Sequence, residues 1–590
     1  MQPITHMNQF VQILKRENEL VEIDIPLDPH LVIPEIQRRV VQRKGPALLF
    51  KNVKGSRFPA ATNLFGSHKR IDLAFGQAPG QFIKDLVHVV ENMLPPKGLG
   101  ELWQMRHLPL KALGIGMKRR KNGPLVQNTL DSLEELPALT SWPEDGGPFV
   151  TLPLVYTQDP KTGKGNLGMY RVQLQGPRQA GMHIQIHRGG GNHYYAAERE
   201  NRGLPACVFV GGPPALVIAS IAPLPEDVPE LVFASLLQGK KLDLIDNPNW
   251  ASLPMVAEAD FCLYGTIPPH KRAPEGPFGD HYGYYSLQHD YPYLEVEKIY
   301  HRDGAIWPAT VVGRPPQEDH YIAIYLQELF SPLFPVVMKG IKDVFAYEES
   351  GVHSLAGAIV SERYHKEAFT CCMRILGEGQ LSLSKVLMAT DAPLDLRNFR
   401  PFFEHVLARC DLRTDVHILS NISLDTLDYT GPEINKGSKA VFIGTGEAKF
   451  DLCKNCPDSL GHGDFSEPRL FCPGVLVVKG PAYKTGNEDP LRLLEVPEIK
   501  PYRLVILHDD PADAVRSDHD FLWHIFTRFE PAGDIYGKGA TVRYHKVFEP
   551  PLVIDCRLKP GYPAVLTPDS DTVAEVDKVW DELNLETHFR

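Results

Sequence analysis

The sequence predicts a multidomain α/β protein with a β-rich middle segment. Three observations support this fold class. The composition is that of a globular chain, with 43% hydrophobic and 23% charged residues. Short β-rich runs dominate residues 126–330, and helix–strand alternation returns after residue 331. A length of 590 residues allows roughly three or four domains of ordinary size. We place these domains at 1–125, 126–330, 331–450 and 470–590.

The first domain mixes helical and strand signals. Residues 31–41 carry apolar side chains at helical spacing, at Val32, Ile33, Ile36 and Val40. The run Ala47–Phe50 reads as a buried strand before turn residues, so we expect a small α/β module. A basic cluster, Lys118–Lys121, lies near its end. Two interpretations of this cluster stay open, a solvated linker face or a contact for an anionic partner.

The second domain reads as a series of short strands separated by Gly, Pro and Asn clusters. This spacing is typical of a barrel or a sandwich, and barrel mouths are common cofactor sites. The predicted strands are Phe149–Tyr156, Met169–Leu174, Met182–Ile186, Ala206–Val210, Ala215–Ala219 and Tyr293–Tyr300.

An internal repeat marks the last two domains. In each copy a strand ends in Asp, and a helix then leads to the pattern R-x-[DE]-x-x-x-D. The first copy runs from Lys385–Asp391 to Arg409, Asp411 and Asp415, and the second from Arg503–Asp509 to Arg528, Glu530 and Asp534. Two copies indicate a duplicated α/β unit, because a solenoid needs three or more. We expect the charged residues to form structural ion pairs or helix caps.

Charge and cysteine content narrow the class of protein. A formal net charge of −11 argues against a nucleic-acid-binding protein. Nine cysteines, two of them adjacent at 371 and 372, do not form a secreted disulfide framework. The N-terminus lacks a signal-peptide pattern, and the most apolar stretch, Ala215–Leu224, is half the length of a membrane span. We therefore expect a cytoplasmic protein without a transmembrane segment.

The loop from Ala273 to His281 holds two acids, Glu275 and Asp280, among Gly and Pro residues. The Gly and Pro residues keep the chain out of a helix, so both carboxylates can converge on one site. Converging carboxylates raise each other's pKa, and one can then donate a proton near neutral pH. The alternative is a turn with two solvated acids.

Three further clusters are candidate ligand sites. His187-Arg188 with its following glycines resembles a phosphate cradle, although a bulge or turn explains it equally well. Asn166, His187 and Asp243 offer oxygen and imidazole ligands for Mn²⁺ or Mg²⁺. The third cluster has two possible interpretations, a zinc site or ordinary loop cysteines. Its members are Cys453, Cys456, His462 and Cys472.

In their order along the chain, these segments resemble the UbiD family of decarboxylases, which use prenylated flavin mononucleotide (prenylated FMN). The motifs that carry the resemblance are Asn166-Leu-Gly-Met-Tyr-Arg171, His187-Arg188-Gly-Gly and Ala273-Pro-Glu275-Gly-Pro-Phe-Gly-Asp280-His281. The likeness extends from Gly45 to Lys439. It implies an N-terminal α/β domain, a central split β-barrel of the flavin-reductase type and a C-terminal α/β domain, to which the repeat adds a diverged duplicate.

The resemblance also implies roles for individual residues. Arg171, Glu275 and Asp280 would form the catalytic group. Mn²⁺ would be bound by Asn166, His187 and Asp243, with K⁺ as a second candidate ion. At position 243 the family usually has Glu, and Asp260 and Tyr264 replace two further family Glu residues. The residues that would line the flavin are Met169, Tyr170, Arg171, His183, Ile184, Gln185, Arg188 and Gly189.

The implied activity is the reversible, non-oxidative decarboxylation of an aromatic or α,β-unsaturated acid in ubiquinone or menaquinone biosynthesis. A flavin prenyltransferase of the UbiX type would supply the cofactor, and the family suggests a homo-oligomer. Two other hypotheses remain. The departures at Asp243 and Tyr264 motivate a non-catalytic flavin-binding or regulatory protein. A carboxylase working in the reverse direction would share the same transition state.

Overall fold

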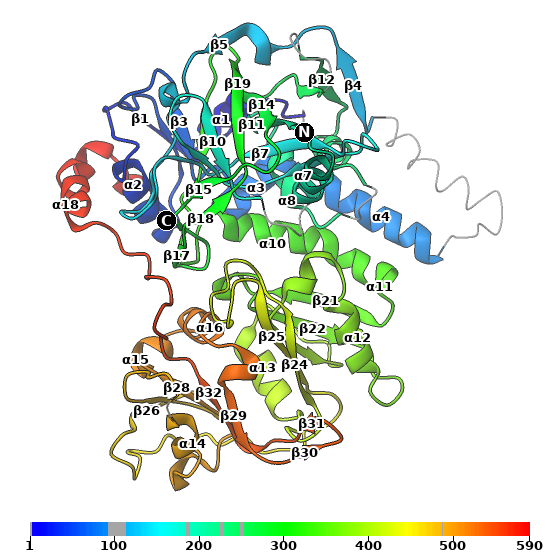
Figure 1. The fold of residues 1–590 in the computed structure, drawn as a ribbon, viewed down its shortest axis with the longest axis vertical. Coiled ribbons are helices and arrows are strands. Elements are labelled where there is room, and N and C mark those ends of the chain that lie inside the picture. Colours follow the sequence, from blue (N-terminus) through cyan, green and yellow to red (C-terminus); the bar gives the residue numbers. More distant parts are fainter. Residues whose placement is uncertain are drawn as a thin grey trace. The chain divides into compact units, whose positions relative to one another are not determined.

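The computed structural model describes residues 3–92, 114–184, 189–224, 228–247, 253–486 and 488–589. The chain forms two compact units, one of residues 1–330 together with 565–590 and one of residues 331–564 (Figure 1). Within the described ranges, no helix combines the length and the apolar character needed to cross a membrane.

The first unit begins with a four-stranded sheet in the order β1-β2-β3-β20. Its strands are β1 (Leu20–Ile23), β2 (Ala47–Phe50), β3 (Ala60–Thr62) and β20 (Trp307–Ala309). The predicted helix is α2 (Val32–Gln42), and the predicted strand is β2 with the expected bounds. The other helices of this region are α1 (Met7–Arg16), α3 (His68–Phe75) and α4 (Ala78–Asn92).

The centre of the first unit is a curled antiparallel sheet of nine strands, in the order β6-β9-β10-β19-β14-β11-β7-β8, with β5 paired to β19. This sheet confirms the predicted barrel-like domain. Apolar side chains on its strands fill one core together with helix α2. The strands are β5 (Asn128–Leu130), β6 (Phe149–Val150), β7 (Leu154–Gln158), β8 (Gly165–Gly168), β9 (Val172–Leu174), β10 (Gln179–Met182), β11 (Leu204–Val210), β14 (Phe261–Ile267) and β19 (Tyr293–His301).

Two predicted strands of this region differ from the structure. Strand β10 ends at Met182, where the predicted strand Met182–Ile186 begins, and His183 and Ile184 lie in no strand, while residues 185–186 lie outside the described residues. Residues 215–219 belong to a helix, α8 (Ala215–Ile221), which follows Pro213 and Pro214. The five residues from Ala215 to Ala219 are all buried. A short run that is apolar on every side has no period, so its sequence does not separate a buried strand from a buried helix.

The second unit contains two five-stranded sheets of the same topology. Their orders are β21-β22-β23-β25-β24 and β26-β27-β28-β32-β29, and in both the outer pairs are antiparallel and the inner pairs parallel. This match agrees with a duplicated unit. The strands are β21 (Ile341–Ala346), β22 (Leu355–Val360), β23 (Val386–Thr390), β24 (Val416–Ser423), β25 (Lys436–Ile443), β26 (Ser466–Cys472), β27 (Val475–Lys479), β28 (Leu504–His508), β29 (Ile535–Lys538) and β32 (Glu549–Asp555).

The two copies share a core and a local contact. Phe471 stacks on Phe521 with ring centroids 3.6 Å apart, within a cluster drawn from both sheets. In each copy the last Asp of the repeated pattern accepts the backbone N–H of the earlier acid, Asp415 from Asp411 at 2.9 Å and Asp534 from Glu530 at 2.7 Å. Asp415 and Asp534 also form ion pairs, with Lys366 and Lys559, so these two acids have the structural role that we expected.

The last residues of the chain return to the first unit. Helix α18 (Ser570–Val579) packs on α2, and Arg39 forms an ion pair with Asp577. Trp580, after this helix, lies under the guanidinium groups of Arg39 and Arg43. The second copy therefore ends before residue 565, earlier than the boundary at 590 that the sequence suggests.

Candidate active site

An arginine between two carboxylates forms the centre of the site. Arg171 precedes strand β9 and donates from Nε and Nη2 to the two oxygens of Glu275, both at 2.8 Å. Its Nη1 donates to Asp280 Oδ2 at 2.5 Å. All three side chains are buried, with Glu275 completely enclosed. The structure thus brings together the three residues that the sequence selected as a catalytic group.

The acid loop, residues 273–286, is held by nested antiparallel pairs. Strand β15 (Ala273–Glu275) pairs with β18 (His289–Tyr291), and β16 (Phe278–Gly279) pairs with β17 (Tyr285–Ser286). Gly276, between the two pairs, has a φ of +88°, which L residues with side chains rarely adopt. As the Gly and Pro content suggested, the chain stays out of a helix, and both acids reach Arg171.

Arg171 and the neighbouring histidines determine the ionisation of both acids. Burial would raise the pKa of Glu275, but Arg171 and His183 outweigh it and lower this pKa to about 2. Burial would likewise raise the pKa of Asp280, but His281 and Arg171 hold it well below its usual value. The expectation that the two carboxylates raise each other's pKa is therefore wrong, since a cation lies between them.

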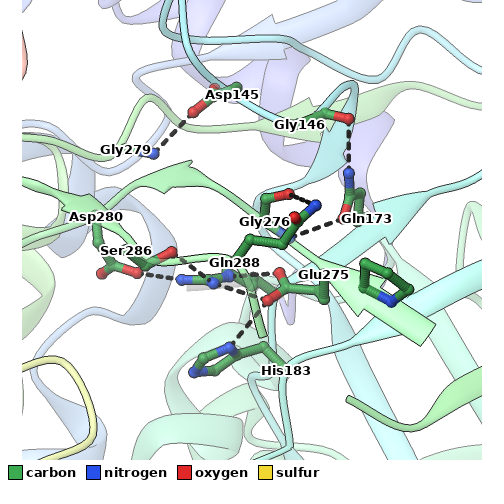
Figure 2. Close-up of polar contacts among 12 residues, drawn as sticks. Asp145, Gly146, Gln173, His183, Glu275, Gly276, Gly279, Asp280, Ser286 and Gln288 are labelled. Carbon is green, nitrogen blue, oxygen red and sulfur yellow. Dashed lines mark hydrogen bonds and ion pairs between the residues drawn. The ribbon is translucent and has the colours of Figure 1, made fainter. Parts of the chain in front are cut away.

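His183 connects the acid loop to the neighbouring region. Its Nδ1 lies 3.1 Å from Glu275 Oε2 (Figure 2), while its Nε2 is buried and has no hydrogen-bond partner within the described part of the chain. Burial and the charge of Arg171 lower the pKa of His183, so the ring is neutral. A buried ring nitrogen without a partner is costly unless a ligand satisfies it.

Two of the other predicted flavin residues, Tyr170 and Gly189, lie beside Asn166. The Tyr170 hydroxyl donates to Asn166 Oδ1 at 3.0 Å and accepts the N–H of Gly190. A Cβ on Gly189, the first residue of α7 (Gly189–Arg199), would lie 2.6 Å from Asn166 Nδ2, so this backbone approach requires glycine. Met169 and Ile184 are described, and Ile184 is buried. Gln185, His187 and Arg188 lie outside the described residues.

Two of the three proposed metal ligands, Asn166 and Asp243, are described, and they have different partners. Asn166 Nδ2 donates to Glu230 Oε1 at 2.8 Å, and Glu230 Oε2 accepts the N–H of Leu167. Asp243, on β12 (Leu242–Ile245), instead accepts two hydrogen bonds from Arg120, at 2.9 and 3.1 Å. Glu230 begins helix α9 (Glu230–Gln238), and burial raises its pKa. The carboxylate beside Asn166 is therefore Glu230, a residue that the sequence analysis did not select.

The four residues considered for zinc do not gather. Within the described ranges, no group of three or more His, Cys, Asp or Glu side chains is arranged to hold a metal ion. Cys456 Sγ donates to the carbonyl of Pro468 at 3.5 Å, and Cys472 is buried on β26. The interpretation as ordinary cysteines is the one that agrees with these contacts.

The two residues that replace family Glu residues near the acid loop lie in structural positions. Asp260 is completely buried and accepts the N–H groups of Gly212 and Ile306 at 2.7 and 3.1 Å. Burial raises its pKa to about 7. Tyr264 is buried on β14, where it pairs in register with Cys207 of β11.

Two polar residues that the sequence did not indicate hold the acid loop. Asp145 Oδ1 accepts the N–H of Gly279 at 2.7 Å, and its Oδ2 accepts those of Ser141 and Trp142, both at 2.9 Å. Gln173 joins Gly276 N to Gly146 O (Figure 2). The contacts with Gly276 and Gly279 link segments more than 100 residues apart, so no local sequence signal identifies them.

We expect Asp145→Ala to lower the free energy of unfolding by about 3 kcal/mol, because three backbone N–H groups lose a buried acceptor. Urea denaturation measures the change. Asp159→Ala is the matched control, since Asp159 also accepts two backbone N–H groups but in an exposed turn. Its expected cost is about 1 kcal/mol or less, because water replaces the acceptor. Equal losses in the two variants would contradict a special role for Asp145.

Comparisons with known proteins agree with this architecture. Residues 11–90, 117–315 and 320–444 match the N-terminal, Rift-related and C-terminal domains of 3-octaprenyl-4-hydroxybenzoate carboxy-lyase, UbiD. The fold and these three domains define a carboxy-lyase. The chain belongs to the UbiD family, so the resemblance found in the sequence is confirmed.

Relatives and solved structures extend the comparison. A protein of Chlamydia pneumoniae, named as one of the subunits of a 4-hydroxybenzoate decarboxylase, is 45% identical over 98% of both chains. An uncharacterized protein of Chlamydia caviae is 44% identical, over 98% of this chain and 99% of its own. The closed form of vanillic acid decarboxylase from Sedimentibacter hydroxybenzoicus shares the fold, with a TM-score of 0.66, 21% identity and coverage of 78% of this chain and 97% of its own.

A second solved structure holds a flavin. The UbiD-class enzyme HmfF from Pelotomaculum thermopropionicum, in complex with FMN, has a TM-score of 0.61 and 22% identity, covering 75% of this chain and 94% of its own. The two structural matches show the three-domain mixed α/β fold with its curled central sheet.

Proposed function

We propose that this carboxy-lyase decarboxylates an aromatic or α,β-unsaturated carboxylic acid with prenylated FMN and a divalent metal ion. The observation that carries the proposal is the buried Arg171 between Glu275 and Asp280. The name of the 45% identical relative supports a hydroxylated aromatic acid as the substrate class. We further propose that the protein acts in quinone biosynthesis, is located in the cytoplasm and forms a homo-oligomer. A flavin prenyltransferase would supply its cofactor.

The residues around His183 and Asn166 fit a flavin with a phosphate-bound metal. His183 Nε2 lacks a partner within the described chain, and the backbone at Gly189 closely approaches the Asn166 amide. Asn166 and Glu230 offer the oxygen ligands that Mn²⁺ or Mg²⁺ prefers, with His187 as the third candidate. When bound, prenylated FMN would accept the electron pair that the departing CO₂ leaves on carbon.

The protein groups have separate tasks in this proposal. The Nε–Nη2 edge of Arg171 is occupied by Glu275, so Arg171 orients both acids and keeps them ionised rather than gripping the substrate through that edge. Asp280 delivers a proton to the carbon after CO₂ leaves, which is a general-acid step. The enclosure of these side chains excludes water from the reacting carbon.

The test is to produce the chain together with a flavin prenyltransferase, to measure the mass of the bound flavin, and to assay CO₂ release from a panel of aromatic acids beginning with 4-hydroxybenzoate. We expect a modified-flavin mass and turnover of at least one acid. A flavin-loaded protein that releases no CO₂, and exchanges none with labelled bicarbonate, would favour the non-catalytic alternative. Faster reaction in the carboxylation direction under high bicarbonate would favour the reverse activity.

The choice between Glu230 and Asp243 as metal ligand is directly testable. We expect Glu230→Gln to reduce Mn²⁺ affinity of the flavin-loaded protein by about 10-fold or more, because an anionic ligand is lost. Asp243→Asn is the matched control and should leave the affinity unchanged, since its carboxylate binds Arg120. Isothermal titration with Mn²⁺ measures both. Loss of affinity in Asp243→Asn alone would return the ligand role to Asp243.

A further inference from the structure

The proposed reaction requires a new proton at every turnover. In the resting site both acids are ionised, because Arg171 lowers the pKa of Glu275, and His281 together with Arg171 lowers that of Asp280. Asp280 therefore has no stored proton to give and must receive one before it acts. Asp280 is itself buried, so a neighbouring group must bring that proton to it.

The two oxygens of Asp280 have different partners. Oδ2 faces Arg171, whose guanidinium does not release a proton in proteins. Oδ1 lies 2.5 Å from Nδ1 of His281 and also accepts the backbone N–H of His281 at 2.7 Å. Since the carboxylate can only accept, Nδ1 is the donor in this contact. His281 is therefore the titratable group in direct contact with the side of Asp280 that faces away from Arg171.

His281 is also the part of this network that water reaches. Its side chain is 26% exposed, against 9% for Asp280 and 8% for Arg171. Its ring meets the edge of the Tyr282 ring, with centroids 4.9 Å apart. An electrostatic interaction also joins His281 to Asp319, in the first turn of α10 (Asp319–Phe330). Two acidic residues, Asp280 and Asp319, thus act on the imidazole.

We propose that His281 is a relay residue that takes a proton from solvent and passes it to Asp280. This inference rests on the proposed decarboxylase function. In the step, the Nδ1–H bond of the imidazolium breaks and an O–H bond forms on Asp280 Oδ1. Asp280 then gives this proton to the substrate carbon, and His281 regains one from water. One solvent proton enters the product for each CO₂ released, and no electrons are exchanged with the relay.

A merely structural role for His281 predicts a different outcome from a relay. His281→Asn keeps a neutral N–H donor near the position of Nδ1, so it preserves the hydrogen bond to Asp280 but cannot carry a proton at neutral pH. We expect kcat to fall about 100-fold with KM nearly unchanged, as for loss of a proton-transfer group. Turnover of His281→Asn within about threefold of the unmodified enzyme would overturn the relay.

Chemical rescue gives a second readout that packing alone would not move. In His281→Ala, added imidazole should restore turnover in proportion to its concentration, and the restored rate should follow the fraction of imidazolium as pH changes. His270→Asn is the matched control, because His270 is an exposed histidine of the same unit and should show neither loss nor rescue. A rescue curve that is flat in imidazole concentration would contradict the proposal.

A spectroscopic test separates failure of the relay from failure of the proposed function. In the flavin-free protein, a proton shared between His281 and Asp280 across 2.5 Å should give a far-downfield proton resonance. The resonance should disappear in His281→Asn and Asp280→Asn and persist in His270→Asn. If the resonance is present but the flavin-loaded protein releases no CO₂, the proposed decarboxylase function is refuted and the contact between His281 and Asp280 is supported. Absence of the resonance from the unmodified protein would refute the relay whatever the activity.

Discussion

Replacing Arg171 with alanine is expected to abolish measurable turnover and to lower the free energy of unfolding by about 3–5 kcal/mol at neutral pH. The physical reason is that Glu275 and Asp280 lose the cation they share, which leaves the buried Glu275 charge beside the neutral His183 and Asp280 beside His281. Urea denaturation followed by fluorescence measures the stability, and CO₂ release by the flavin-loaded enzyme measures the activity.

The loss of stability in Arg171→Ala should depend on pH in a definite direction. In the unmodified protein the pKa of Glu275 is about 2, below its usual value of 4.5. Such a group contributes stability above about pH 4.5, and this contribution is lost as the pH falls toward about 2. In Arg171→Ala burial dominates and raises this pKa. The difference in free energy of unfolding between the two proteins should therefore be largest at neutral pH and shrink below about pH 4.

Arg178→Ala is the matched control for this variant. Arg178 is an exposed arginine near β10 that donates to the carbonyl of Glu297, and its loss should change the free energy of unfolding by less than about 0.5 kcal/mol. A difference between Arg171→Ala and the unmodified protein that is independent of pH would contradict the assigned ionisation of the two acids.

The parts of the fold that were predictable from sequence are those with a local period or local turn chemistry. Helix α2 was found because its apolar residues recur at helical spacing, and strand β2 was found because turn residues follow its short apolar run. The two sheets of the second unit were visible as a repeat. Helix α8 was missed because an apolar run buried on all sides has no period. The return of residues 565–590 to the first unit depends on tertiary contacts of α18, which local patterns do not encode.

The residues of the candidate site likewise divide into those with a local sequence signal and those without one. The acid loop was found because Gly and Pro residues surround its carboxylates within one short segment. The sequence analysis paired Asn166 with Asp243, whereas the carboxylate that Asn166 contacts is that of Glu230. Glu230 lies at a helix start with no local motif around it. Asp145 and Gln173 bind Gly279 and Gly276, which are more than 100 residues away in the sequence, so no local pattern identifies them.

Asp280→Asn should reduce turnover about 1,000-fold or more while the protein still folds and binds flavin. Asparagine has nearly the same volume and can still accept from Arg171, but it cannot gain and release a proton. Because the variant removes a step rather than a binding contact, kcat should fall while KM changes little. The measurements are kcat and KM for CO₂ release, the flavin content of the purified protein, and deuterium incorporation from D₂O into the product.

Two companion variants separate proton delivery from general disruption of the acid loop. Asp290→Asn alters an exposed acid on β18, the strand that pairs with β15, and should retain normal turnover. Glu275→Gln weakens the bidentate contact with Arg171 and should lose stability as well as activity, because the arginine is then left partly uncompensated in a buried site. Turnover in Asp280→Asn close to that of Asp290→Asn would remove Asp280 as the proton donor. If Asp280→Asn lowers the free energy of unfolding as strongly as it lowers turnover, Asp280 would instead be part of the scaffold that positions Arg171.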